Sequence, residues 1–352
     1  MHVVSETRKT ARCHLTLIDH GVTFHFLRRE PYHLAPYYFY ATGVARTRRL
    51  LHALKPDLVV GFGTDEPYAW EAAHNGFPFA IYMQGVVEEL APYLDWPSFH
   101  VRAARWMEHR ALLHAAGVVA ESAFVQKWAS TRAPQALVTT IPNCLRDGFV
   151  NIQPARPDHG LDLWCVGELS RLKNPEIVLQ AFQAAAVPAA RLHFAGTGPL
   201  QRKLKTRIHQ FGLADRCDLH GWMDPSLLAQ ALARATALVH ASWMDSSPNV
   251  AVEAHAAGIP VIATAVGGIP SRVHHEVDGL LVPPGDVAAM ASAMRRLLGS
   301  PETTARMGAA GRERVLREHD PARVAQLHAE FYERLIASQP TLTPEGRGRS
   351  EE

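Results

Sequence analysis

Short runs of apolar, β-branched residues alternate with longer segments of helical periodicity along most of the chain. The short runs predict strands at residues 22–26, 57–61, 79–83, 118–121, 161–166, 191–195, 237–240 and 260–263. The longer segments predict helices at residues 41–54, 102–114, 174–182, 287–298, 301–318 and 321–338. Strands that are apolar along their whole length and alternate with helices are typical of parallel sheets covered on both faces. The pattern therefore predicts an α/β fold with doubly wound sheets.

A break in this pattern divides the chain. Residues 151–160 contain two prolines and a glycine and precede a new predicted strand. We predict an N-terminal Rossmann-like domain at 1–150 and a C-terminal one at 151–338. The polar tail at 339–352 is predicted to be disordered. Two facing doubly wound domains bind ligands in the cleft at the C-terminal ends of their strands.

The composition excludes several classes of protein. The 352 residues carry 36 basic and 34 acidic side chains, a net charge of +2, which does not fit a nucleic-acid-binding protein. No apolar run approaches the about 20 residues that span a bilayer. The N-terminal residues lack the apolar stretch of a secretory signal, and the four cysteines show no CxxC spacing. We expect a cytoplasmic protein, with any membrane contact peripheral and at the inner face.

Candidate chemistry gathers in residues 238–272. Ser247 is a good N-cap for a helix that starts near residue 248, and Gly258 is a good C-terminal stop. This places Asp245 in the loop before the helix and Glu253 inside it. Free backbone N–H groups and the helix dipole favour a phosphate at such a helix N-terminus. On their own, these two carboxylates are equally compatible with a solvated helix face.

The same segment resembles the signature of glycosyltransferase family 4, retaining enzymes of the GT-B fold that use nucleotide-sugar donors. That signature has two acidic residues separated by seven others, here Asp245 and Glu253, the second followed by Ala254. A Gly-x-Pro-Val strand and a Gly-Gly-x-Pro turn follow, here at 258–261 and 267–270. The resemblance implies that Glu253 hydrogen-bonds the ribose hydroxyls and that Asp245, usually a glutamate in the family, contacts the donor sugar.

A second block, residues 164–182, resembles the family segment that carries a catalytic lysine. The resemblance assigns Lys173 to the donor diphosphate, where a fixed cation stabilises the charge that builds up as the glycosidic bond breaks. The family's arginine is replaced by Glu168, and Arg171 is the candidate substitute. Lys173 is also compatible with a solvated lysine before a helix.

The remaining implied donor contacts come from both halves of the chain. Backbone amides at Ser247, Asn249 and Val250 are expected to complete the phosphate site. Residues 55–63 and 77–85 resemble N-terminal family segments, and Gln84 stands where the family often has a histidine that contacts the sugar. The resemblance thus implies Asp245 and Lys173 as catalytic residues and Glu253, Arg171, Ser247, Asn249, Val250 and Gln84 as donor-binding residues.

The N-terminus departs from the family. Members open with a strand, a Gly-rich loop and a helix before the strand that residues 2–5 match, so we expect a truncated N-terminal domain with unpaired sheet edges, explained by a late start site or a shortened product. The loss is expected to remove part of the acceptor side of the cleft.

No metal or cofactor is expected. The sequence has no HExxH motif and no His-x-x-x-His pair beside an acid, and the fold class binds its donor without a structural metal. The prediction is a retaining glycosyltransferase that moves a sugar from a nucleotide-diphosphate sugar to a glycan, lipid-linked or small-molecule acceptor, in surface polysaccharide, glycolipid or glycoside synthesis.

Two alternatives stay open. One is a degenerate member of the same fold that binds a nucleotide sugar or a protein without catalysis, as the changes at Glu168 and Gln84 indicate. The other is a dehydrogenase, because Gly196 and Gly198 begin a dinucleotide fingerprint. Its third glycine is replaced by Gln201.

Overall fold

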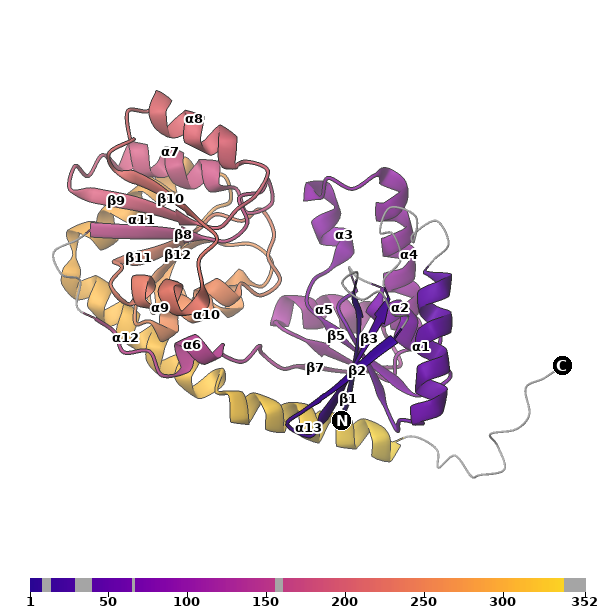
Figure 1. The fold of residues 1–352 in the computed structure, drawn as a ribbon. Helices are drawn as coiled ribbons and strands as arrows, with labels where there is room; N and C mark the ends of the chain where they lie inside the picture. Colours follow the sequence, from indigo (N-terminus) through magenta and orange to yellow (C-terminus); the bar gives the residue numbers. More distant parts are fainter. Residues whose placement is uncertain (8–13, 29–39, 65–66, 156–160, 339–352) are drawn as a thin grey trace.

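The computed structural model describes residues 1–7, 14–28, 40–64, 67–155 and 161–338, and Figure 1 shows two α/β halves joined along one side by a pair of long helices. Among these residues no helix is both long and apolar enough to cross a membrane. The predicted disordered tail at 339–352 lies outside the described residues.

The C-terminal half is built on one six-stranded sheet in which every neighbouring pair is parallel. The strand order is β10-β9-β8-β11-β12-β13. The strands are β8 (Leu161–Val166), β9 (Ala190–Ala195), β10 (Cys217–Gly221), β11 (Ala237–His240), β12 (Val261–Thr264) and β13 (Gly279–Val282). The topology switches direction beside β8, so the loops after β8 and β11 open at the same crevice.

Helices cover both faces of this sheet, and each face has its own apolar core. On one face lie α7 (Pro175–Ala185), α8 (Gln201–Gln210) and α11 (Val287–Gly299). On the other lie α9 (Pro225–Ala233), α10 (Asn249–Ala256) and α12 (Pro301–Glu318), together with the short α6 (Asp147–Val150). The sheet is therefore doubly wound, as predicted.

The N-terminal half holds two separate sheets. A parallel four-stranded sheet has the order β4-β5-β6-β7. Its strands are β4 (Val59–Phe62), β5 (Phe79–Met83), β6 (Gly117–Ala120) and β7 (Leu137–Thr140), and its helices are α1 (Ala41–Leu54), α2 (Tyr68–Ala73), α3 (Val87–Leu90), α4 (Ser98–His114) and α5 (Ala123–Arg132). The chain also has two short 3-10 helices, η2 (Ala91–Tyr93) in this half and η3 (Ile269–Ser271) in the C-terminal half.

The second N-terminal sheet has the order β1-β3-β2, with β1 (His2–Thr7), β2 (His14–Asp19) and β3 (Val22–Arg28). Strand β1 pairs with β3 in parallel, whereas β2 and β3 form an antiparallel hairpin. His20 and Gly21 turn this hairpin with φ values of 46° and 77°, the positive pair that a two-residue hairpin turn requires. Within the described residues, β1 and β4 pair on one side only.

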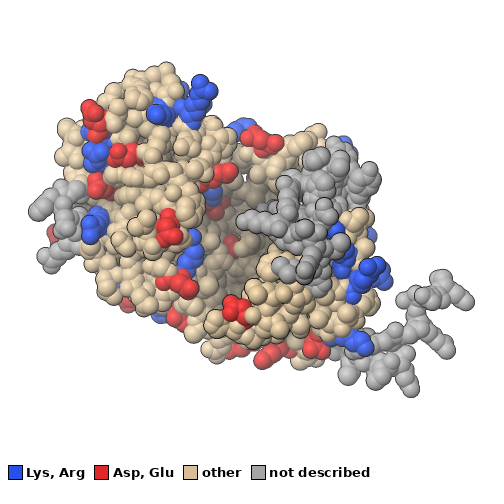
Figure 2. Space-filling view, viewed as in Figure 1, with Lys and Arg blue, Asp and Glu red and all other residues tan. Residues whose placement is uncertain are grey.

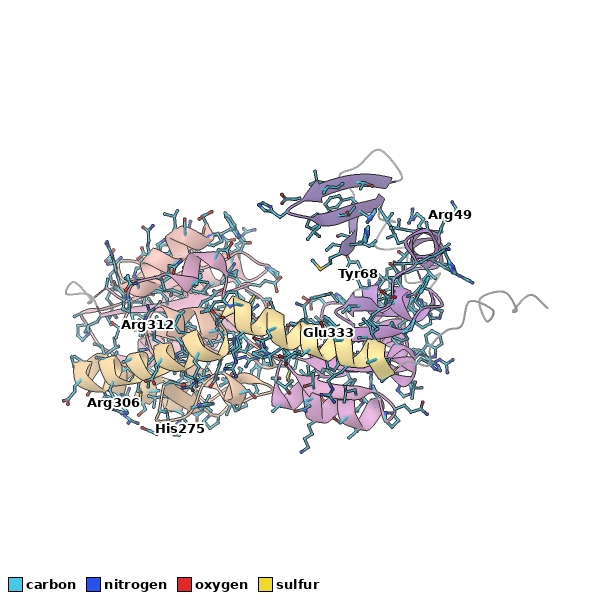
Figure 3. The ribbon with its side chains drawn as sticks, turned by 90° about the horizontal axis from the view of Figure 1, so that it is seen from below. Arg49, Tyr68, His275, Arg306, Arg312 and Glu333 are labelled. Carbon is cyan, nitrogen blue, oxygen red and sulfur yellow. The ribbon has the colours of Figure 1, made fainter. Side chains whose placement is uncertain are left out.

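The last helix, α13 (Pro321–Ser338), returns to the N-terminal half. Figure 3 shows α12, with Arg306 and Arg312, and α13, with Glu333, passing beneath both halves. Phe331 and Leu335 of α13 pack with residues of β5 and β6. Helix α6, by contrast, precedes residue 151 but packs in the C-terminal core. The domain division after residue 150 stays a prediction.

Candidate functional site

The candidate site lies where the two halves face one another. Figure 2 shows a hollow there, with acidic and basic side chains on its walls. The C-terminal half contributes the loops after β8 and β11 and the start of α10. The N-terminal half contributes Glu121 at the end of β6 and the loop 141–146 after β7. These are the strand ends at which a doubly wound fold binds its ligands.

Asp245 is the best-connected acid of this site. Its Oδ2 lies 2.5 Å from Lys173 Nζ and 3.0 Å from Nε2 of His240, the last residue of β11, and its Oδ1 accepts a hydrogen bond from the Ser247 backbone N–H at 3.3 Å. Burial raises the pKa of Asp245, but the Lys173 ammonium and the His240 hydrogen bond outweigh it and hold that pKa well below its usual range. The structure thus brings together both predicted catalytic residues, with Asp245 ionised.

The glycine pair of the Gly-Gly-x-Pro turn holds the Asp245 loop in place. The Gly268 N–H donates to the Asp245 carbonyl at 2.8 Å. A Cβ atom at Gly268 would lie 1.7 Å from the Ser246 carbonyl oxygen, and one at Gly267, whose φ is +52°, would lie 2.4 Å from that of Asp245. Only glycines allow the two loops to approach this closely.

The prediction that Ser247 caps the helix is wrong. Helix α10 starts at Asn249 with Pro248 at the N-cap and no side-chain capping bond. The Ser247 hydroxyl instead accepts a hydrogen bond from Arg272 Nε at 2.9 Å, and the same guanidinium donates to the Glu121 carbonyl of the other half. The Ser247 hydroxyl, which would accept the capping hydrogen bond, is bonded to the buried Arg272 instead. The predicted stop is confirmed: Gly258 follows the helix with a φ of +81°.

Glu253 is buried within α10 and is paired with Arg146. Its Oε1 lies 2.6 Å from Nε and 2.5 Å from a terminal nitrogen of Arg146, which comes from the loop before α6. Burial raises the pKa of Glu253, and Arg146 acts against that rise. Glu253 Oε2 makes neither of these two contacts.

The other predicted donor-binding residues lie around this centre. Asn249 is exposed, and its Oδ1 accepts a hydrogen bond from Asn143 Nδ2 at 2.7 Å. Val250 is half-buried in the first turn of α10. Arg171 and Gln84 are exposed, and neither contributes to the polar contacts around Asp245 and Glu253 described above.

Glu121 is a site residue that the sequence analysis missed. The residue is only 3% exposed, and its Oε1 has no hydrogen-bond partner among the described residues. Burial raises the pKa of Glu121 to about 8, opposed by Asn143 and Arg272 and reinforced by the charge of Asp245. Its position directly after a buried parallel strand was the available signal.

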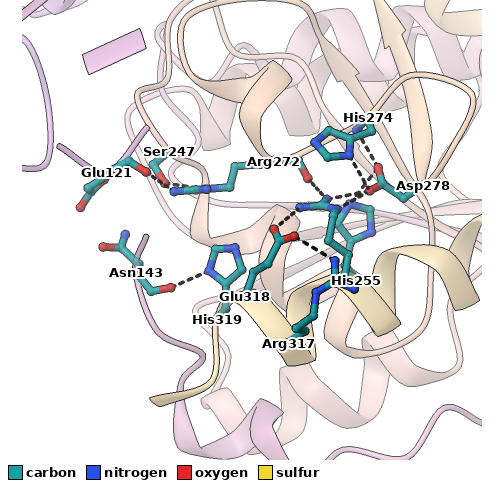
Figure 4. Close-up of polar contacts among 11 residues, drawn as sticks. Glu121, Asn143, Ser247, His255, Arg272, His274, Asp278, Arg317, Glu318 and His319 are labelled. Atoms are coloured by element: carbon teal, nitrogen blue, oxygen red, sulfur yellow. Dashed lines mark hydrogen bonds and ion pairs between the residues drawn. The ribbon is translucent and has the colours of Figure 1, made fainter. Parts of the chain in front are cut away.

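A buried polar network supports the site from behind (Figure 4). Arg314 of α12 donates to the Arg272 carbonyl at 2.6 Å and pairs with Asp278 at 2.7 Å. His319, between α12 and α13, lies 2.6 Å from the Asn143 carbonyl through Nδ1. Helix α12 therefore holds the backbone of Arg272, whose guanidinium bonds Ser247 and Glu121.

The comparisons with known proteins agree with this geometry. Residues 152–314 match the family described as glycosyl transferases group 1. The match lies on the half of the chain that carries Asp245, Lys173 and Glu253, and it confirms the resemblance found in the sequence.

Individual relatives show how much of the chain the sequence similarity covers. A D-inositol 3-phosphate glycosyltransferase of Segniliparus rotundus is 32% identical over 168 residues, which are 45% of this chain and 37% of that protein. The curated relatives that match first are covered over no more than 37% of their length.

Solved structures resemble nearly the whole chain. Sucrose-phosphate synthase from Thermosynechococcus elongatus has a TM-score of 0.81 at 21% identity, covering 96% of this chain and 89% of that one. Anabaena HepE in complex with UDP has a TM-score of 0.71 at 21% identity, covering 88% and 86%. The chain has the predicted GT-B fold.

Proposed function

We propose that the chain is a retaining glycosyltransferase that moves a hexosyl group from a nucleoside-diphosphate sugar to an acceptor hydroxyl. The observation that carries the proposal is the pairing of Asp245, in the loop before α10, with Lys173, in the loop before α7, with Glu253 one turn into α10. The family match of the same segment supports it.

In this proposal the diphosphate occupies the N-terminus of α10. Backbone N–H groups at Asn249 and Val250 and the Lys173 ammonium would neutralise it, whereas the predicted donor Ser247 N–H already donates to Asp245 Oδ1. The bond from the anomeric carbon to the diphosphate oxygen breaks, and the acceptor oxygen bonds to that carbon on the same face. The acceptor's proton passes to the departing diphosphate oxygen, so no side-chain base is needed. Asp245, already ionised, would accept hydrogen bonds from the sugar hydroxyls.

The ribose is assigned to Glu253. Both Arg146 contacts use Oε1, so Oε2 can accept from one ribose hydroxyl while the pair persists, and both oxygens can accept once Arg146 moves away. Binding of both ribose hydroxyls by Glu253 would require release of Arg146 from Oε1. The proposal therefore assigns Arg146 a gating contact as well as a structural one.

The similarity to HepE, which has been solved with UDP-glucose, makes that donor the first to test. We would measure melting temperatures with UDP-, GDP- and ADP-sugars for the wild type, Glu253→Gln and, as a matched control, Glu313→Gln, an exposed carboxylate on α12. A ligand at about 100 times its Kd stabilises by about 2.7 kcal/mol, a shift of several degrees. We expect one donor class to shift the wild type and the control but not Glu253→Gln.

Transfer itself is measured as donor-dependent nucleotide release and sugar incorporation with a panel of glycan, lipid-linked and small-molecule acceptors, and the anomeric configuration of the product by NMR. We expect the configuration of the donor to be kept. An inverted product contradicts the retaining mechanism, and a melting temperature that no nucleotide sugar changes contradicts the donor site.

A second candidate is a nucleotide-sugar-binding protein without transferase activity. It is favoured by Gln84, which cannot carry a proton where the family often has histidine, and by Glu168 in place of the family's arginine. Donor binding that depends on Glu253, with no nucleotide release for any acceptor, would select this candidate.

A further inference from the structure

Three chemistry-bearing side chains that the donor site does not use meet at the edge of the C-terminal sheet. Leu192 and Phe194 of β9 point into the core beneath α7 and α8, so His193 between them points to the opposite face. On the neighbouring edge strand β10, Asp218 and His220 lie beside it. His193 and His220 are 27 residues apart in the chain, which is why no sequence motif predicts the group.

The ligand atoms of these three residues have the spacing of a metal site. His193 Nδ1 lies 3.1 Å from His220 Nε2 and 3.3 Å from Asp218 Oδ2, and all three atoms lie within 4.8 Å of one another. Bonds of about 2.0–2.1 Å in a tetrahedral arrangement place ligand atoms about 3.3 Å apart. Two of the three distances between ligand atoms therefore fit coordination of a single cation with little movement of the side chains.

The surroundings hold the ligands in orientation. The Trp164 ring stacks on both imidazoles, with centroid distances of 4.7 Å to His193 and 5.1 Å to His220. Arg191 donates to Asp218 Oδ2 at 2.9 Å, and that oxygen keeps a second lone pair. The two rings and the carboxylate are thus fixed before any ion arrives.

A second carboxylate lies behind His193. Asp162 Oδ1 lies 3.5 Å from His193 Nε2 and is buried without a hydrogen-bond partner among the described residues. A proton on Nε2 facing Asp162 leaves Nδ1 with a lone pair toward His220 and Asp218. Carboxylate, histidine and metal in that order are the usual arrangement of a bound imidazole.

We propose that His193, Asp218 and His220 bind a borderline divalent cation of the Zn²⁺ class, with water in the fourth position. Two imidazoles and one carboxylate suit such a cation better than Mg²⁺ or Ca²⁺, which prefer oxygen ligands. The side chain of His193 is 12% exposed and that of Asp218 38%, so solvent reaches the group. The ion would tie edge strand β10 to β9, a role separate from the donor site beside β11.

The test is a Zn²⁺ titration of the metal-free full chain by calorimetry, with the visible absorption of Co²⁺ as a second probe of tetrahedral coordination. We compare the wild type with His220→Ala and Asp218→Asn, and use His109→Ala, an exposed histidine on α4, as the matched control. We expect one equivalent of tight binding in the wild type and control, and a Kd about tenfold weaker or more in both ligand variants.

Asp162→Asn tests the positioning residue, since it leaves all three ligands in place. Loss of such an outer partner weakens metal binding by about 10–100-fold. Zn²⁺ should also raise the melting temperature of the wild type more than that of His220→Ala, whose side chain is exposed and whose loss should leave the fold intact. Equal Zn²⁺ affinity in the wild type and both ligand variants, or no saturable equivalent in the wild type, would overturn the proposal. Neither readout depends on glycosyl transfer.

Discussion

Replacing Glu121 by glutamine should make the protein more stable at alkaline pH. Burial raises the pKa of Glu121 from 4.5 to about 8. The folded state therefore keeps a proton that the unfolded chain loses near pH 4.5, and it binds more protons than the unfolded state between these two values. Stability contributed by this group is thus present at low pH and is lost as the pH rises through the window from about 4.5 to 8. A glutamine side chain at this position would not titrate.

The size of the effect follows from the pKa difference. A shift of about 3.5 pH units at about 1.4 kcal/mol per unit gives about 5 kcal/mol above pH 8. This is an upper value, because water that enters the cleft between the halves stabilises the ionised carboxylate. The amide keeps the shape of the side chain and can still donate to and accept from Asn143, so little else changes.

The assay is the melting temperature of wild type and Glu121→Gln from pH 5 to pH 9. We expect near-equal values at pH 5 and a gap of several degrees in favour of the variant at pH 9, at about 2–4 °C per kcal/mol. Glu333→Gln, an exposed carboxylate on α13, is the matched control and should show no such gap. Parallel curves for wild type and Glu121→Gln would refute the reasoning.

Three substitutions test the supports of the site. Gly268→Ala forces its Cβ against the Ser246 carbonyl and should lower the melting temperature and abolish the donor-induced shift; an unchanged shift would contradict the packing argument. Arg314→Met leaves the buried Asp278 carboxylate without its ion pair, at about 3–5 kcal/mol by denaturant unfolding, and a loss below about 1 kcal/mol would count against it. Leu335→Ala should cost about 2–5 kcal/mol and speed amide exchange in α13; exchange at the wild-type rate would exclude its docking role.

Buried central strands and long amphipathic helices could be predicted from the sequence. The strands at 79–83, 161–166 and 237–240 and the helices at 41–54, 301–318 and 321–338 have the predicted bounds. Their apolar pattern is local, so no distant contact is needed to recognise it. The strands β2, β7 and β13 were missed. Strand β13 has four residues including a glycine, so its strand character depends on pairing with a neighbour.

The carboxylates and lysine of the candidate site could be predicted because they lie within two short stretches of the C-terminal half. Glu121, Asn143 and Arg146 could not, because their contacts are with residues far away in the chain. Ser247 shows that local sequence rules can also fail within the C-terminal half. A serine before a proline is a good cap by local rules, but Arg272, 25 residues away, binds its hydroxyl.

The contacts across the cleft make the site sensitive to how the halves are held together. Asn143 on Asn249 and Arg272 on the Glu121 carbonyl join one half to the other, and Arg146 on Glu253 lies beside them. The chain segment that fixes their spacing is the turn between α12 and α13, where His319 bonds the Asn143 carbonyl. Since α13 is also the helix that packs on the N-terminal sheet, any opening of the cleft must bend the chain near this turn or break the His319 contact. Donor binding that displaces Arg146 from Glu253 would therefore change the contacts of His319. This residue is more than 60 positions away from both Asp245 and Glu253 in the sequence.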